Sequence, residues 1–374
     1  MADTVNERLH DRAISHAVDL TRYGNGVVRR MMAILNRVDP DLVAQIAAAL
    51  ERLPPSSFTV SRLESLLGSV REINAAAYRR VFDGLRTEIG AHAAYEAGYQ
   101  ADLLASLIPD EVLVRVGFYR VAPDQVYAAA LSRPFQGGLL KDWAASIEAD
   151  RMKAVRNAIR VGYVEGQTTD QIVRRIRGTR AAQYSDGVLE GSRRNLASIV
   201  RTAVSHTAAT ARGEVYQANA DLIKATAWVS TLDLRTTSEC IIRDGKQYTA
   251  DASHKPIGHK VPWLQGPGRL HFGCRSTEAP VVKSLKELGI DIPDLPEASR
   301  ASMDGQVPKS TTYSDWLARQ SAARQDDILG PKRGQLLRQG GLSTDQLFSN
   351  RGDFLTLDQL RERDASAFKR AGVT

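Results

Sequence analysis

The residues best suited to chemistry are two cysteines and a histidine in the second half of the chain. His271 and Cys274 are separated by two residues, a spacing that lets neighbouring turns present two soft ligands to Zn²⁺, and Cys240 could join them. A fourth ligand could come from water or from a nearby side chain: Asp233, His254 or His259. The alternative is two buried cysteines beside a hydrogen-bonded histidine, since free cysteine is usually a small core residue. The sequence therefore predicts no certain cofactor, and zinc is the one candidate cofactor that these residues suggest.

A charged set lies around these residues. Asp233 and Arg235 are two positions apart, so on a strand they would share a face and could pair with Arg275 or order the loop. We expect a structural ion-pair network, because such networks also bring charges of this kind together. A disulfide between the cysteines is disfavoured in a reducing compartment. No arrangement of a nucleophile and a base stands out, so we expect no enzymatic activity.

A strongly basic stretch precedes this region, in a chain of 374 residues whose formal charge is +7. Such a surface could contact DNA through phosphates, in a salt-sensitive and sequence-independent way. The alternatives are a solvated helix face or a docking surface for acidic protein loops. Between positions 151 and 212 the candidate contact residues are Arg151, Arg156, Arg160, Arg174, Arg175, Arg177, Arg193, Arg194 and Arg201.

Helical periodicity dominates the elements that must position these residues. Residues 1–135 predict an N-terminal helical region, with a helix start at Asp39-Pro40-Asp41 and a cap at Thr59 or Ser61 for a later helix. Residues 136–225 predict a basic helical part, comprising a long helix, a short helix capped by Thr168 or Thr169, and a third helix over about 193–219.

The remaining sequence changes character twice. Residues 226–283 are rich in β-branched and aromatic residues around an Asp244-Gly245 turn, which predicts a small α+β core. Residues 284–374 begin as a loose, proline-bearing linker and end as short helical pieces, an extension expected to pack on another surface. The predicted fold class is therefore mainly α with a small α+β module, in an elongated, multi-part helical protein.

Two segments, WVSTLDLRTTSECIIRDGKQY and VPWLQGPGRLHFGCRSTEAPVV, resemble the motif of the Mu F-like family of phage head morphogenesis proteins. The resemblance covers about residues 137–283. Many relatives end the motif in Cys-Arg-Cys, whereas Ser276 follows Arg275 here, which removes one potential metal ligand. The matching positions are Trp228, Asp233, Arg235, Thr236, Cys240, Gly245, Pro262, His271, Cys274 and Arg275.

The resemblance implies a structural minor head protein, assembled in the host cytoplasm and present in several copies in the virion head. Its expected partners are the portal protein or the major capsid protein, and packaged double-stranded DNA without sequence specificity. Its expected role is in head assembly, DNA packaging and retention, or delivery. The alternatives are a metal-dependent nuclease or a non-specific DNA-binding factor of the phage head. No apolar run approaches the roughly 20 residues that cross a bilayer, so we expect no membrane segment.

Overall fold

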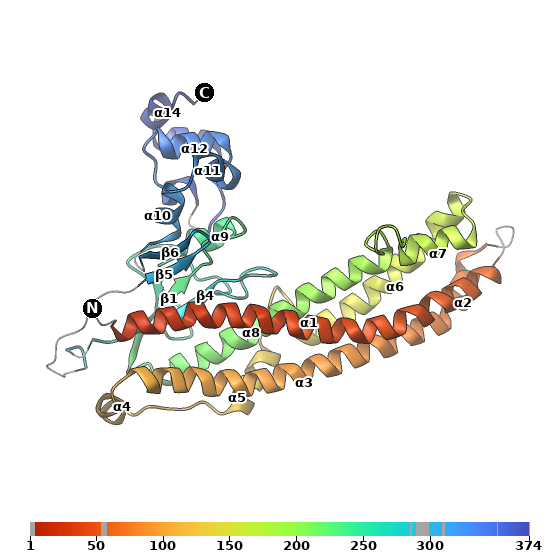
Figure 1. Cartoon of the computed structure of the whole chain (residues 1–374), viewed down its shortest axis with the longest axis horizontal. Coiled ribbons are helices and arrows are strands. Elements are labelled where there is room, and N and C mark those ends of the chain that lie inside the picture. The colour runs from red at the N-terminus through yellow and green to blue at the C-terminus, as the bar shows by residue number, and fades with distance from the viewer. Residues whose placement is uncertain are drawn as a thin grey trace. The chain divides into compact units, whose positions relative to one another are not determined.

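A computed structural model describes residues 4–53, 58–284, 286–288, 299–308, 311–349 and 351–373. The chain divides into two compact units. The first unit gathers Met1–Leu20, Ala94–Val126 and Ala208–Thr374, and the second gathers Thr21–Ala93 and Tyr127–Thr207. In the described part of the chain, fourteen α-helices accompany one four-stranded sheet and one two-stranded sheet, which confirms the mainly α prediction (Figure 1).

Helix α1 (Val5–Glu51) runs straight through Pro40, so the predicted helix start at Asp39-Pro40-Asp41 is wrong. A proline inside a helix removes one backbone hydrogen bond and costs about 3 kcal/mol. Burial offsets this cost, because the apolar face continues on both sides of the proline, with Leu35 and Leu42 fully buried. Tertiary packing therefore overrides the local helix-breaking signal.

The second unit is a set of packed helices. It contains α1 from Thr21 onward and α3 (Gly68–Leu107) up to Ala93. It also contains α2 (Val60–Leu66), most of α5 (Pro123–Ser132), α6 (Leu140–Val164), α7 (Thr169–Arg177) and most of α8 (Val188–Ala218). Two apolar clusters form its core, one centred on α1, α3 and α8 and the other joining α1 and α2 to α6 and α7.

Two predicted helix caps in this unit are confirmed. The Thr59 hydroxyl accepts a hydrogen bond from the backbone N–H of Arg62 at the start of α2. Thr168 forms a capping box with Gln171 at the start of α7. Helix α8 begins at Val188, ahead of the predicted start near residue 193.

The small α+β module of the first unit is an antiparallel sheet of order β3-β2-β1-β4. Strand β1 (Ile223–Val229) lies at its centre, paired with β4 (Thr277–Val282) on one side and β2 (Gln247–Tyr248) on the other. Strand β3 (Pro256–Ile257) pairs with β2 at the edge. The short helix α9 (Ser238–Ile241) follows β1, and the predicted Asp244-Gly245 turn leads from it into β2.

The predicted linker contains a hairpin that the sequence analysis missed. Strands β5 (Ser299–Ser302) and β6 (Gly305–Pro308) pair with Ser302 opposite Gly305, which leaves Met303 and Asp304 as a two-residue loop. The Asp-Gly pair at this loop was the available signal. Residues 289–298 of the predicted linker lie outside the described residues.

The C-terminal extension folds on the small module. Its helices are α10 (Tyr313–Ala318), α11 (Ala322–Leu329), α12 (Pro331–Arg338), α13 (Leu357–Arg363) and α14 (Ala365–Ala371), with a 3-10 helix at Thr344–Leu347. Trp316, Leu317 and Leu336 share one apolar cluster with Leu232 and Ile241 of the module. The first unit also holds α4 (Asp110–Val116). Among the helices searched, which cover the described residues, none has the length and apolar content that crossing a membrane would require.

Candidate metal centre and basic surface

A tight turn places His271 and Cys274 side by side just before β4. The backbone N–H of Cys274 donates to the carbonyl of His271 at 3.1 Å, and Gly273 at the third position of the turn has φ +71°. A positive φ at that position favours glycine, because a Cβ atom there would be strained. The sequence His-Phe-Gly-Cys therefore encodes the local geometry that brings the two side chains together.

Cys240 reaches the same place from helix α9. The carbonyl of Cys240 accepts a hydrogen bond from the Ser230 hydroxyl at 2.9 Å, and that hydroxyl in turn accepts from the Trp228 indole at 3.1 Å. Trp228, Trp263 and Leu270 pack with both cysteines in one buried cluster. The two thiols therefore lie in a mostly apolar setting, fixed through the end of β1.

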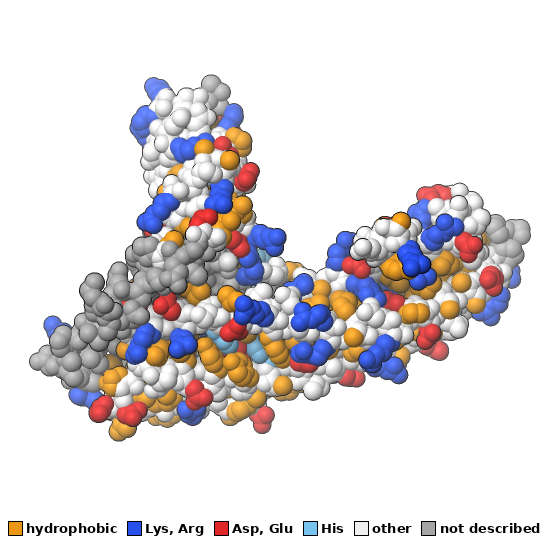
Figure 2. Space-filling model, in the orientation of Figure 1, with side chains coloured by type: hydrophobic (Ala, Val, Ile, Leu, Met, Phe, Trp, Pro, Cys, Tyr) orange, Lys and Arg blue, Asp and Glu red, His pale blue; other side chains and the backbone are white. Residues whose placement is uncertain are grey.

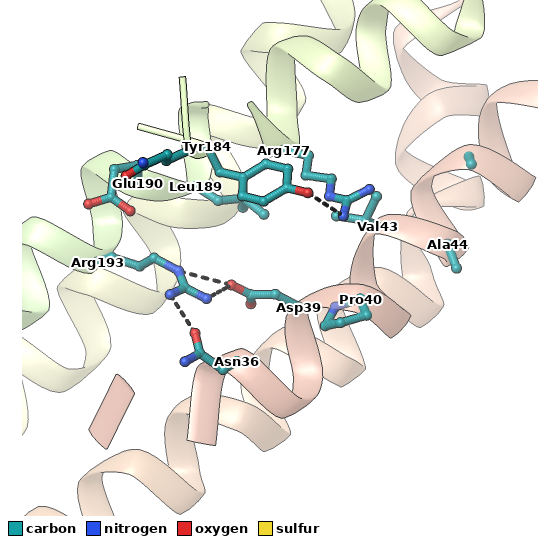
Figure 3. A pocket seen from close by; sticks show the side chains of 12 residues that line it. Asn36, Asp39, Pro40, Val43, Ala44, Arg177, Tyr184, Leu189, Glu190 and Arg193 are labelled. Carbon is teal, nitrogen blue, oxygen red and sulfur yellow. Dashed lines mark hydrogen bonds and ion pairs between the residues drawn. The ribbon is translucent and has the colours of Figure 1, made fainter. Parts of the chain in front are cut away.

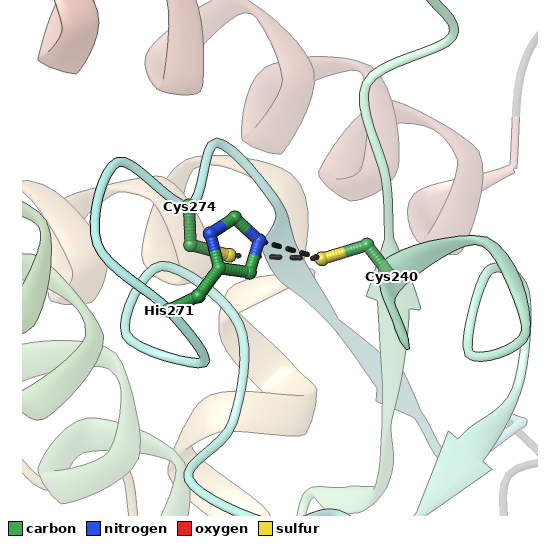
Figure 4. Close-up of side chains that lie close together, drawn as sticks. All are labelled: Cys240, His271 and Cys274. Carbon is green, nitrogen blue, oxygen red and sulfur yellow. Dashed lines mark hydrogen bonds between the residues drawn. The ribbon is translucent and has the colours of Figure 1, made fainter. Parts of the chain in front are cut away.

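The three candidate ligand atoms converge (Figure 4). The Cys240 sulfur lies 3.8 Å from the Cys274 sulfur and 3.6 Å from Nε2 of His271, and all three atoms lie within 4.8 Å of one another. Both cysteines are free thiols, so the structure contains no disulfide between them. The side chain of His271 is half-buried and those of both cysteines are buried.

The thiols also perturb one another's ionisation. A hydrogen bond between the two sulfurs raises the pKa of Cys240, and burial raises it further. The same hydrogen bond lowers the pKa of Cys274, although burial opposes this effect. Burial lowers the pKa of His271, but the nearby Cys274 sulfur outweighs burial and raises it. Cys274 is therefore the more readily ionised thiol.

The predicted fourth ligands are engaged elsewhere. Nε2 of His259 lies 2.8 Å from the carbonyl of Gln247, and its Nδ1 accepts from a backbone N–H. The ring of His254 stacks on Trp263 at 4.4 Å between centroids. Asp233 is held by an arginine, as described next. Within the described residues, the cluster of His, Cys, Asp and Glu at this place has three members.

The predicted ion pair is present. Arg275 donates to both carboxylate oxygens of Asp233, at 2.5 and 2.8 Å, and the backbone N–H of Arg235 donates to one of them at 2.9 Å. Burial alone would raise the pKa of Asp233, but the guanidinium of Arg275 and the backbone N–H hold it below its usual range. Thr236 also donates to this carboxylate, at 3.3 Å. The Arg235 side chain is exposed and takes no part in the pair.

The remaining motif residues have structural places. Trp228 is fully buried, Gly245 occupies the positive-φ position of its turn and donates its N–H to the carbonyl of Trp228, and the carbonyl of Pro262 accepts from Arg243.

Two buried residues, Arg243 and Asp244, join the module to the C-terminal extension, a role that the sequence analysis did not predict for either of them. Arg243 donates to the carbonyls of Pro262, Glu239 and Arg351, and desolvation lowers its pKa. The Asp244 carboxylate accepts from the N–H groups of Ser230 and Tyr313, both at 2.7 Å. Their partners lie up to 108 positions away, so no local pattern marks them.

The predicted basic face is only partly exposed. Arg151 is 1 % exposed and pairs with Asp39, so its assignment to a DNA-contacting surface is wrong. Arg212, from the same stretch, is buried beside Glu278 in the first unit. Three candidates are partly buried in ion pairs: Arg156 with Glu64, Arg175 with Glu165 and Arg193 with Asp39. The exposed candidates are Arg160, Arg174, Arg177, Arg194 and Arg201.

Figure 2 shows that, on the face it draws, basic side chains over α2, α6 and α7 alternate with acidic and hydrophobic ones. DNA or portal contact by these arginines stays a prediction.

A pocket of about 540 Å³ opens between α1 and the segment that joins α7 to α8. The arginines that line it are engaged with neighbouring side chains (Figure 3). Arg193 donates to Asp39 at 2.6 Å and to Asn36 at 2.7 Å, and Arg177 donates to the Tyr184 hydroxyl at 3.2 Å. Arg193 therefore fastens α8 to α1, Arg177 fastens α7 to the joining segment, and we assign the pocket no ligand.

Comparison with known proteins gave one finding, and it concerns the region that contains the candidate metal ligands and most of the basic stretch. Residues 153–279 match the model of a family described as phage Mu protein F like protein. Searches of curated proteins and of solved structures gave no match. The matched region includes the second half of α6, all of α7 and α8, the four-stranded sheet except the second half of β4, and the Cys240, His271 and Cys274 cluster. Residues 153–279 of this chain are therefore a region of the phage Mu protein F-like family.

Proposed function

We propose that the chain is a structural minor head protein of a tailed bacteriophage. The observation that carries this proposal is the family match over residues 153–279. Its partners are the portal protein or the major capsid protein, and it works through binding during head assembly, DNA packaging and retention, or delivery. It is built in the host cytoplasm and kept in the virion in several copies.

The local chemistry favours binding over catalysis. Asp233 is neutralised by Arg275, and His259 has both ring nitrogens engaged. A nuclease site would need an activating base and metal ligands that converge around a phosphate. Thiolates are instead soft ligands, suited to holding zinc. We therefore rank the nuclease alternative below a structural role.

The decisive experiment compares DNA-filled virions with emptied virions by quantitative mass spectrometry. The proposal expects the chain in filled particles at a low copy number, and loss on emptying would add delivery with the genome. A second experiment deletes the gene. Particles assembled at normal yield and with normal infectivity without it would overturn the proposal.

DNA contact is tested separately, by the salt dependence of binding. Each lost phosphate contact reduces the magnitude of the negative slope of log K against log salt by about 1. Replacing exposed Arg174 and Arg177 of α7 by alanine should make this slope less steep, whereas replacing exposed Arg363 of α13 by alanine should not change it. Equal slopes for both variants would remove α7 from the DNA-contacting surface.

A further inference from the structure

We propose that Cys240, His271 and Cys274 bind one Zn²⁺ ion, with a water molecule in the fourth position, and that this ion fastens helix α9 to the turn before β4. The ligands come from two segments of the small module, separated by 31 and 34 positions. The inference stands apart from the head-protein proposal, because it concerns the chain itself and not its place in a particle.

Two of the three separations between ligand atoms, both measured from the Cys240 sulfur, match those of a tetrahedral zinc ion. With Zn–S bonds of about 2.3 Å and a Zn–N bond of about 2.0–2.1 Å, tetrahedral angles place two sulfurs about 3.8 Å apart and a sulfur and a nitrogen about 3.6 Å apart. The observed separations from the Cys240 sulfur are 3.8 Å to Cys274 and 3.6 Å to His271. A disulfide would instead require the sulfurs to approach to about 2.05 Å.

The histidine is oriented for coordination. Nδ1 of His271 donates to the carbonyl of Phe272 at 3.0 Å, which leaves Nε2 as the nitrogen that faces the sulfurs. Metal-bound histidines commonly donate their other ring nitrogen to a carbonyl or a carboxylate, which fixes the tautomer and the ring orientation. Such an arrangement is already in place here.

The surroundings suit a neutral metal complex. Zn²⁺ with two thiolates and one neutral imidazole carries no net charge, so burial against Trp228, Trp263 and Leu270 costs little. The Thr237 hydroxyl lies 3.1 Å from Nε2 of His271, so the polar edge of the cluster includes a hydroxyl beside the candidate ligand atoms. The cluster offers three protein ligands among the described residues, so water completes the four.

The first test uses the intact wild-type chain, expressed with added zinc and purified in a non-chelating reductant. Elemental analysis should find one zinc ion per chain. Replacement by Co²⁺ should give the intense visible bands of tetrahedral cobalt and a thiolate-to-cobalt charge-transfer band. A protein that holds no zinc and develops neither band with Co²⁺ would overturn the proposal, as would a Cys240–Cys274 disulfide in metal-free protein kept in reductant.

Matched variants identify the ligands. Cys274→Ser and His271→Asn should each lower the affinity for Zn²⁺ at least tenfold, while His259→Asn, which changes a histidine with both nitrogens engaged, should leave it unchanged. Circular dichroism checks that each variant keeps its helices. If a folded Cys274→Ser protein bound zinc as tightly as wild type, the ligand assignment would be wrong.

Discussion

Replacing Asp39 by asparagine should destabilise the second unit although it barely changes the shape of the side chain. Its carboxylate accepts hydrogen bonds from Arg151 and from Arg193, the latter at 2.6 Å. Arg151 is almost fully buried, and its Nε and Nη1 atoms have no hydrogen-bond partner within the described part of the chain. Its remaining favourable neighbour is the Tyr78 ring, 5.7 Å from the guanidinium carbon. Asp39 therefore provides most of the compensation for this buried charge.

The magnitude follows from that burial. Removing one partner of a buried ion pair costs about 3–5 kcal/mol, because the other charge stays buried and uncompensated. Asp39→Asn keeps one carbonyl oxygen as an acceptor, so we expect a loss of about 3 kcal/mol, at the low end of that range.

Glu64→Gln is the matched control. Glu64 also pairs with two arginines, Arg71 and Arg156, but all three side chains are between 31 and 45 % exposed. Exposed pairs contribute about 0–1 kcal/mol. The two variants therefore make the same chemical change and differ in burial.

Hydrogen exchange monitored by mass spectrometry measures the difference in the second unit. A loss of about 3 kcal/mol speeds exchange through opening of this unit about a hundredfold, since each tenfold change corresponds to about 1.4 kcal/mol. Peptides from α6 should show this acceleration in Asp39→Asn and less than about fivefold in Glu64→Gln. Equal exchange rates in the two variants would refute the reasoning that burial makes Asp39 important.

Three further predictions concern other parts of the chain. Thr168→Ala removes the α7 capping box and should cost about 1 kcal/mol in a urea titration, with no loss if the cap is unimportant. A hydrogen bond from Arg30 holds the pKa of Glu88 below its usual value, so wild type should exceed Glu88→Gln in melting temperature above about pH 4.3. That advantage should shrink as the pH falls through the folded-state pKa, and a pH-independent gap would contradict it. Gly352→Ala should cost about 1–3 kcal/mol more than Gly258→Ala by thermal melting, because its Cβ would lie 2.6 Å from Glu239, whereas Gly258 has open space; equal costs would contradict this.

Local signals in the sequence predicted much of the secondary structure. The Thr168 cap, the Asp244-Gly245 turn and the two-residue gap between His271 and Cys274 each depend on neighbours along the chain. Such caps and turns depend on backbone geometry within a few residues, so the types of those residues are enough to predict them. The convergence of Cys240 on the other two ligands needed the sheet, because α9 and β4 are brought together by their shared neighbour β1.

Long-range partners explain what the sequence did not predict. Arg151 resembles any other arginine on a basic helix, and its burial depends on a carboxylate 112 positions earlier. Pro40 resembles a helix start, and α1 continues through it because residues on both sides are buried. In both cases the tertiary contact overrides the local preference, and a pattern confined to one segment contains no sign of that contact.

Helix α8 lies within the family match but packs on helices that lie outside it. The family match begins at residue 153, yet the α8 residues Leu196 and Val200 are buried in a cluster with Val27 and Leu85, which lie outside the match. A fragment that contains only the matched residues would expose the α8 side of this apolar cluster to water and would tend to aggregate. A transplant of this region into another protein should therefore need helices equivalent to α1 and α3 in order to fold.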